Sequence, residues 1–75
     1  MKNAVLRFDG QPRGRRMETA TALTELLLQG YCRVKMTRFH ILQDGTGEQC
    51  TWRYELPDGT GATLRVLYPY DTEES

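Results

Sequence analysis

Cysteine, histidine and serine, the side chains of nucleophilic catalysis, are few in this sequence. The chain has Cys32 and Cys50, one histidine (His40), and one serine (Ser75) at its end. Nucleophilic catalysis needs a cysteine or serine beside a base. In the strand register derived below, Cys50 and His40 point to opposite faces of a sheet. The candidate carboxylate pairs, Asp44 with Glu48 and Asp58 with Glu55, lie in or beside predicted hairpin turns, where nothing removes water from them as tuning for general acid–base catalysis requires. We therefore expect a protein that is not an enzyme.

The same residues lack the spacing of a metal site. Cys32, His40 and Cys50 are separated by eight and then ten residues, without the short CxxC or HxxxH pairs of metal ligands. The Gly45/Gly47 and Gly59/Gly61 pairs precede predicted strands, whereas a phosphate-binding loop opens a helix. We expect no metal, no cofactor and no small-molecule substrate. Two cysteines without an export signal indicate reduced thiols and a cytoplasmic location.

An arginine-rich segment is the most informative polar feature. Arg13, Arg15 and Arg16 lie within four residues, directly before a predicted helix, where the helix dipole favours acids over cations. Arginines beside the free N–H groups of a helix N-terminus suit a phosphate or a carboxylate. The alternative interpretation is a basic loop that only aids solubility. Ten Lys and Arg balance ten Asp and Glu, which argues against indiscriminate capture of DNA or anionic membranes.

Apolar periodicity predicts the elements that position these residues. We predict a strand over residues 3–8, a loop over 9–16, a helix over 17–29 and strands over 31–43, 48–56 and 61–68. The favoured N-cap of the helix is Thr19, with Glu18 or Arg16 as alternative, earlier starts, and Gly30 ends the helix. The predicted buried face of the helix consists of Ala20, Leu23, Leu26 and Leu27.

The last two strands form a hairpin whose register follows from its turn. The sequence Pro57-Asp58-Gly59 is typical of a three-residue loop with a left-handed glycine. Paired residue numbers then sum to 116, which places Trp52 opposite Leu64. Cys50 and Val66, and Tyr54 and Ala62, form the neighbouring pairs, and all six side chains share one face. We predict that this face packs on the helix.

In residues 31–43 the apolar residues alternate in two different phases, which would point to opposite faces of a regular strand. Cys32, Val34 and Met36 share one phase, and Phe39 and Ile41 share the other. A β-bulge near residues 37–38 would bring both phases to the face of Trp52. The alternative, a three-residue loop within 44–47, would bury Arg38 and His40 without partners, so we favour the bulge.

These elements predict an α+β fold. We expect a single two-layer domain of the order β-α-β-β-β, with one helix packed on a mostly antiparallel sheet that ends in a three-stranded meander. The domain spans residues 1–70, and residues 71–75 form an acidic tail that we expect to be flexible. The place of the first strand in the sheet stays open. No apolar run is long enough to span a membrane.

The outer face of this sheet is predicted to be basic. It should carry Arg33, Lys35, Arg53 and Arg65, but the aromatic residues that would stack on RNA bases point to the other face. Near the C-terminus, Tyr68 either packs under the helix or joins Tyr70 as an aromatic anchor for a partner. The residues that we expect to bind a partner are Arg13, Arg15, Arg16, Arg53, Arg65 and Tyr70.

Together these patterns predict a small binding protein. It should dock on a larger protein or nucleoprotein complex through an acidic or phosphate-bearing surface and modulate or inhibit it. A phage or mobile-element inhibitor of a bacterial host system fits the size. The alternative is a small nucleic-acid-binding protein that uses the arginine loop and the basic outer face of the sheet. A homodimer through that face or through an edge strand is a further expectation.

Overall fold

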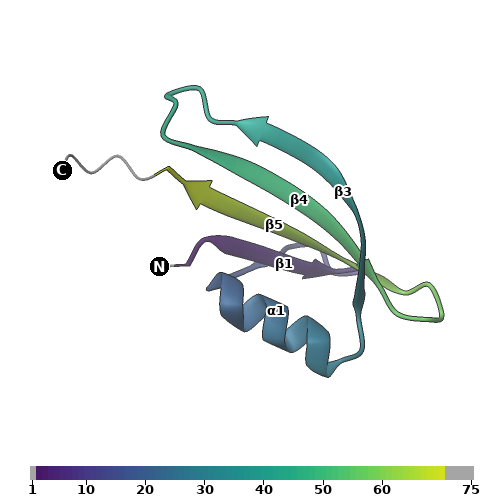
Figure 1. Cartoon of the computed structure of the whole chain (residues 1–75). Coiled ribbons are helices and arrows are strands. Elements are labelled where there is room, and N and C mark those ends of the chain that lie inside the picture. Colours follow the sequence, from purple (N-terminus) through teal and green to yellow (C-terminus); the bar gives the residue numbers. More distant parts are fainter. Residues whose placement is uncertain (1, 71–75) are drawn as a thin grey trace.

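An antiparallel sheet of five strands with one helix on one face forms the described part of the chain, residues 2–70 (Figure 1). In this computed structural model the elements are β1 (Ala4–Phe8), β2 (Arg15–Met17), α1 (Thr19–Leu28), β3 (Cys32–Ile41), β4 (Gly47–Glu55) and β5 (Gly61–Pro69). The strand order is β2-β1-β5-β4-β3. The predicted α+β class with a C-terminal meander is confirmed. The acidic tail, residues 71–75, lies outside the described residues.

The β4–β5 hairpin has the predicted register. Trp52 pairs with Leu64, and the neighbouring pairs also follow the sum of 116. The Leu56 N–H donates to the Thr60 carbonyl at 2.8 Å, and Gly59 has φ +91°, a left-handed conformation that glycine adopts without strain. The turn residues and the apolar alternation therefore specify the same pairing.

The predicted loop over residues 9–16 is partly wrong, because its end belongs to a short strand. β1 inserts between β5 and β2, and Leu6 and Ala4 of β1 pair with Arg15 and Met17 of β2. A strand of three residues is too short to show an alternating pattern of its own. Its pairing is supplied by β1, whose place in the sheet the sequence had left open.

α1 begins two residues later than predicted and has Glu18, not Thr19, as its N-cap. Met17 is still paired with Ala4 in the sheet, so its backbone cannot join the helix. The helix ends as predicted at Gly30, which has φ +89° and donates its N–H to the Leu27 carbonyl at 3.0 Å. No helix of the described residues is long and apolar enough to cross a membrane.

The core lies between α1 and the half of the sheet formed by β1, β5 and part of β4. Its most deeply buried large side chains are Leu6, Leu26, Leu64 and Val66. On the helix only Ala22 and Leu26 are buried, and no residue of β3 joins the core. The prediction that Ala20, Leu23 and Leu27 face the core is therefore wrong, because α1 lies over β1 and covers only part of the sheet (Figure 1).

Two register shifts interrupt β3. The predicted bulge is confirmed between Met36 and Arg38, and it places Phe39 opposite Cys50 on the helix side of the sheet. A second shift, between Arg33 and Lys35, was not predicted. Each bulge adds one residue and exchanges the two faces for everything that follows it.

The burial difference between core and helix surface predicts the effect of truncating single leucines. We expect Leu64→Ala to lower the free energy of unfolding by about 2–4 kcal/mol, because it leaves a cavity in the core. Leu28→Ala, on a side chain that is 80% exposed, should change it by less than about 0.5 kcal/mol. Urea denaturation followed by far-UV circular dichroism measures both, and equal effects would contradict the described core.

Candidate functional site

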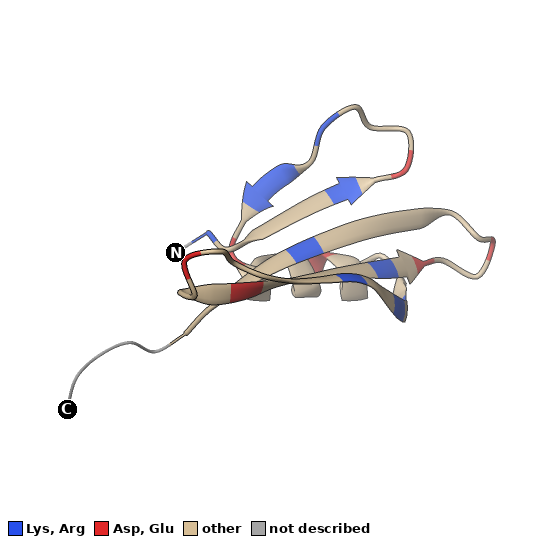
Figure 2. Cartoon of the chain, turned by 90° about the horizontal axis from the view of Figure 1, so that it is seen from above, with Lys and Arg blue, Asp and Glu red and all other residues tan. Residues whose placement is uncertain are grey.

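The face of the sheet that points away from α1 is open and basic. Side chains alternate along each strand, so every strand sends its outward residues to this face. The "basic sheet face" consists of Arg7, Arg16, Lys35, Arg38, His40 and Arg65. Acidic residues lie mostly in turns and near strand ends (Figure 2), where the Asp44 and Asp58 carboxylates accept hydrogen bonds from Thr46 and Thr60 of their own turns.

Three arginines of the basic sheet face lie in one row across the sheet. Arg38 and Arg65 lie on either side of Thr51, on neighbouring strands. Arg65 and Arg16 likewise lie on either side of Val5. Neighbouring strands are about 4.8 Å apart, so consecutive arginines of the row are roughly 10 Å apart and the row is about 20 Å long. One extended anionic partner could therefore contact all three.

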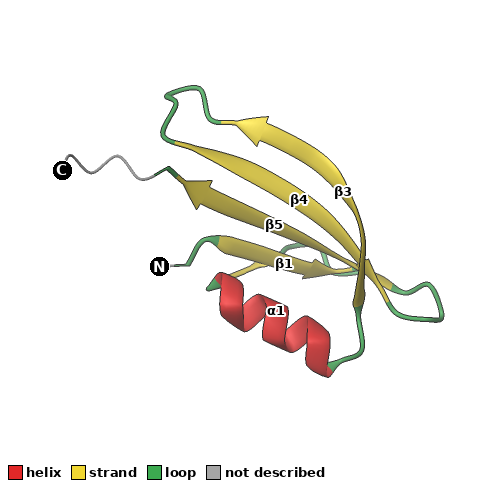
Figure 3. Cartoon of the chain, viewed as in Figure 1, coloured by secondary structure: helices red, strands yellow, loops and turns green. Residues whose placement is uncertain are grey.

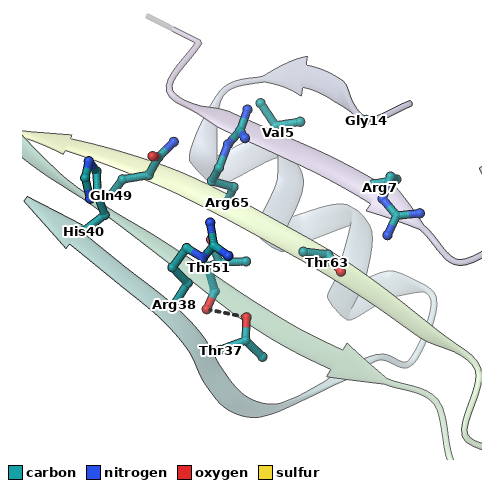
Figure 4. Close-up of a pocket in the computed structure, with 10 residues that line it drawn as sticks. All are labelled: Val5, Arg7, Gly14, Thr37, Arg38, His40, Gln49, Thr51, Thr63 and Arg65. Carbon is teal, nitrogen blue, oxygen red and sulfur yellow. Dashed lines mark hydrogen bonds between the residues drawn. The ribbon is translucent and has the colours of Figure 1, made fainter. Parts of the chain in front are cut away.

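A hollow of about 510 Å³ lies over the middle of this face (Figure 4). Its lining consists of Val5, Arg7, Gly14, Thr37, Arg38, His40, Gln49, Thr51, Thr63 and Arg65. No carboxylate lines the hollow. The Thr37 hydroxyl donates to the Thr51 carbonyl at 3.3 Å, which ties β3 to β4 at its floor. Arginine, threonine and glutamine are the side chains that commonly donate to phosphate oxygens.

The arginines of the row are not neutralised within residues 2–70. The side chains of Arg16, Arg38 and Arg65 form no ion pair or hydrogen bond with any other described residue. Like charges directly opposite each other on a sheet are destabilising, and at roughly 10 Å the repulsion between exposed charges is weaker and screened by salt. An arrangement that folding alone does not favour is a candidate for function.

Arg53 points to the same side of the sheet but is occupied within the chain. Its two terminal nitrogens donate to the Asp9 carboxylate at 3.0 and 2.9 Å, and its Nε donates to Glu55 at 3.3 Å. The Gly61 N–H also donates to Asp9, at 3.2 Å. The hydrogen bond from Arg53 holds the pKa of Asp9 below its usual range, and the bonds to Asp9 and Glu55 raise the pKa of Arg53. This Asp9–Arg53 contact joins the turn after β1 to the β4–β5 hairpin.

The structure does not bring the side chains of the three arginines of the predicted binding loop together. Arg15 and Arg16 are neighbours on β2, so their side chains point to opposite faces. Arg15 lies on the helix side and donates to Glu25 at 3.1 Å, whereas Arg16 joins the basic sheet face. Arg13 is exposed in the turn before β2. Of these three arginines, only Arg16 lies on the same face as Arg65.

The two C-terminal tyrosines lie away from the basic sheet face. The Tyr70 hydroxyl donates to Glu48 at 3.2 Å, and the Tyr70 N–H donates to the Thr46 carbonyl at 2.8 Å. Burial, and then the bond to Glu48, raise the pKa of Tyr70. Tyr68 pairs with Glu48 on the helix side but is 43% exposed, so the expectation that it packs under the helix is wrong. α1 does not reach that end of the sheet.

Sequence reasoning missed two arginines and misplaced one. Arg7 was missed because the first strand could not be placed. Arg38 was kept out of the core by the predicted bulge, but it was not counted among the binding residues. Arg33 was predicted on the outer face, but the second register shift turns it to the helix side. There its guanidinium lies 4.2 Å from the centre of the Trp52 ring and donates to the Tyr54 hydroxyl at 3.2 Å.

The Asp9–Arg53 contact predicts how stability depends on pH. A carboxyl group with a lowered pKa in the folded state adds stability above its unfolded pKa, and this is lost as the pH falls through the folded pKa. We therefore expect Asp9→Asn to be less stable than the natural chain at pH 7, and the difference to shrink as the pH falls below about 4, the unfolded value. Urea denaturation at neutral and at acidic pH measures this, and an equal difference at both would contradict the charged contact.

The described residues hold no group of three or more His, Cys, Asp or Glu side chains that could bind a metal ion. Cys50 is buried and Cys32 is exposed, and both are free thiols. His40 and Cys50 point to opposite faces of the sheet, as predicted from the register. Comparison with protein-family models, curated proteins and solved structures gives no match, so the function proposed below rests on this geometry alone.

Proposed function

We propose that the chain is a non-enzymatic binding protein whose basic sheet face docks on the phosphate backbone of a nucleic acid, free or within a nucleoprotein complex. The observation that supports this is the row formed by Arg16, Arg65 and Arg38, none of which has an acidic partner in the described chain. A partner that supplies several anions at once relieves the repulsion between these cations. A nucleic-acid backbone carries one charge per phosphate at short regular intervals.

The composition of the face favours phosphates over an acidic protein surface. Interfaces between proteins owe most of their binding energy to a few buried anchors, typically Trp, Tyr or Arg, and arginine anchors there usually lie beside aromatic or apolar groups. The described outward residues of the paired strands include no Phe, Tyr or Trp, and the large apolar ones are Val5 and Leu67. The face instead combines arginines with threonines and a glutamine. We therefore narrow the docking surface expected from the sequence to a phosphate-bearing one, while modulation or inhibition of the partner stays a prediction.

The position of the aromatic residues indicates how a nucleic acid would be held. Sequence-specific recognition of single strands depends on bases that stack on exposed aromatic rings. Trp52 and Tyr54 lie on the helix side, where Arg33 covers them. The basic sheet face would therefore contact the sugar–phosphate backbone and bind with little sequence preference. Such binding releases counterions and weakens steeply with salt.

We expect Arg16→Gln, Arg38→Gln and Arg65→Gln each to weaken binding to nucleic acid. Each should also reduce the slope of log affinity against log salt concentration by about 1, because one phosphate contact is lost. Fluorescence anisotropy with short labelled duplexes of DNA and RNA, and with the matching single strands, measures both quantities between about 50 and 200 mM salt.

Arg15→Gln is the matched control, because it removes the same charge from the same strand but on the helix side. It should leave the affinity and the salt slope nearly unchanged. If none of the probes binds, or if Arg15→Gln weakens binding as much as Arg16→Gln, the proposal is wrong. Binding to polyglutamate without binding to any nucleic acid would also overturn it and would favour an acidic protein partner.

A further inference from the structure

The helix side of the sheet is only half covered. Five strands make a sheet roughly 20 Å wide, whereas a helix with its side chains is about 10 Å in diameter. α1 lies over β1, and β4 and β3 extend beyond it (Figure 3). The uncovered part is wide enough for one more helix, and the described chain has only α1.

The uncovered half of this side is apolar. Met36, Phe39 and Ile41 of β3, together with Tyr68 of β5, point to the helix side by their register. They are 42–55% exposed, and we call these four residues the "apolar platform". One carboxylate interrupts this half, because Glu48 lies between Ile41 and Tyr68 in the sheet and accepts a hydrogen bond from the Tyr70 hydroxyl. The Arg33 guanidinium beside the platform is stacked on Trp52. The rest of the platform is apolar and would select an apolar partner surface.

One flank of α1 is apolar and faces the same way. Leu23 and Leu27 are one turn apart and are 38% and 74% exposed; we call them the "leucine ridge". Glu25 lies on the opposite flank of the helix, where it pairs with Arg15 of β2. Because β2 and β3 are the two opposite edges of the sheet, the leucine ridge faces the β4–β3 half. Ridge and platform thus form one exposed apolar surface.

We propose that this surface binds a second copy of the chain. In the two-fold dimer the leucine ridge of each copy packs on the apolar platform of the other, so that each sheet gains the second helix that its width allows. A two-fold interface requires both complementary parts on the same surface of one chain, and this chain has both.

Charge favours this face over edge-to-edge pairing of the sheets. The β3 edge carries Lys35, Arg38 and His40 and no acidic residue, so two β3 edges would bring like charges together. The two bulges of β3 also interrupt a regular pairing edge. Packing ridge on platform keeps these cations on the outer side of each sheet. It differs from the outer-face or edge-strand dimer expected from the sequence.

The exposed area matches what a dimer needs. With about 200 Å² for a fully exposed large side chain, the ridge and the platform expose roughly 600 Å² per copy, or about 1,200 Å² for two, the lower limit of stable interfaces. Contiguous apolar patches of this size on a monomer usually mark an interaction site. We therefore expect a dimer whose formation depends on concentration.

Sedimentation velocity over a range of protein concentrations tests the proposal without any ligand. The natural chain should show a concentration-dependent shift to the dimer. Leu27→Glu on the ridge and Phe39→Lys on the platform should each raise the dissociation constant at least tenfold. Leu28→Glu is the matched control, because Leu28 is 80% exposed but lies beside Glu25 on the other flank of the helix from the leucine ridge. It should leave the dimer intact.

Mixing the two defective variants tests the contact itself. A Leu27→Glu copy and a Phe39→Lys copy form one native ridge–platform contact and one Glu–Lys contact, so the mixture should recover the dimer. Circular dichroism checks that each variant is folded, and Ile41→Lys replaces Phe39→Lys if that variant unfolds. A natural chain that stays monomeric at all concentrations, or a mixture without recovery, would overturn the proposal. Neither result depends on whether the basic sheet face binds nucleic acid.

Discussion

The pairing of β5 with both β1 and β4 is the contact on which the rest of the structure depends. β5 is the central strand, and its alternate residues serve two surfaces at once. Leu64 and Val66 point to the helix and are nearly fully buried, while Arg65, between them, points outward into the row of arginines. A shift of this strand by one residue would bury a guanidinium and expose the core. The core and the basic sheet face are therefore specified by the same register.

The parts of the fold that could be predicted are those in which local signals agree. The turn at Pro57-Asp58-Gly59 and the alternation on both sides of it give the β4–β5 register, and Gly30 marks the end of α1. β2 could not be predicted, because a three-residue strand is specified by its partner β1 and not by its own pattern. The buried face of α1 was misread because Ala20, Leu23 and Leu27 were assumed to face the core together with Leu26, whereas the helix covers only half of the sheet.

The candidate site was harder to predict than the fold, because its residues converge only through long-range pairing. Arg65 was assigned correctly to the outer face from the hairpin, but Arg16 and Arg38 reach the same row from the opposite edges of the sheet. Arg53 has the right residue type and the right face, yet Asp9, distant in sequence, already occupies it. Arg33 was assigned to the wrong face because the register shift between Arg33 and Lys35 has no turn residue in the sequence that would predict it. Composition and spacing thus identify candidate cations, and tertiary pairing decides which of them are free.

Charged side chains are distributed unequally between the two sides of the sheet in residues 2–70. Unpaired cations gather on one side of the sheet, while Glu25, Glu48, Asp44 and Asp58 lie in turns or toward the helix side. Within residues 2–70, this asymmetry contributes an electric dipole component roughly perpendicular to the sheet. In the field of a polyanion that component favours approach by the basic sheet face over approach by the helix side. The net charge of zero belongs to the full sequence and includes Asp71, Glu73 and Glu74, so residues 2–70 hold ten cations and seven acids. The described part of a chain that is neutral overall can therefore both attract a polyanion and turn toward it.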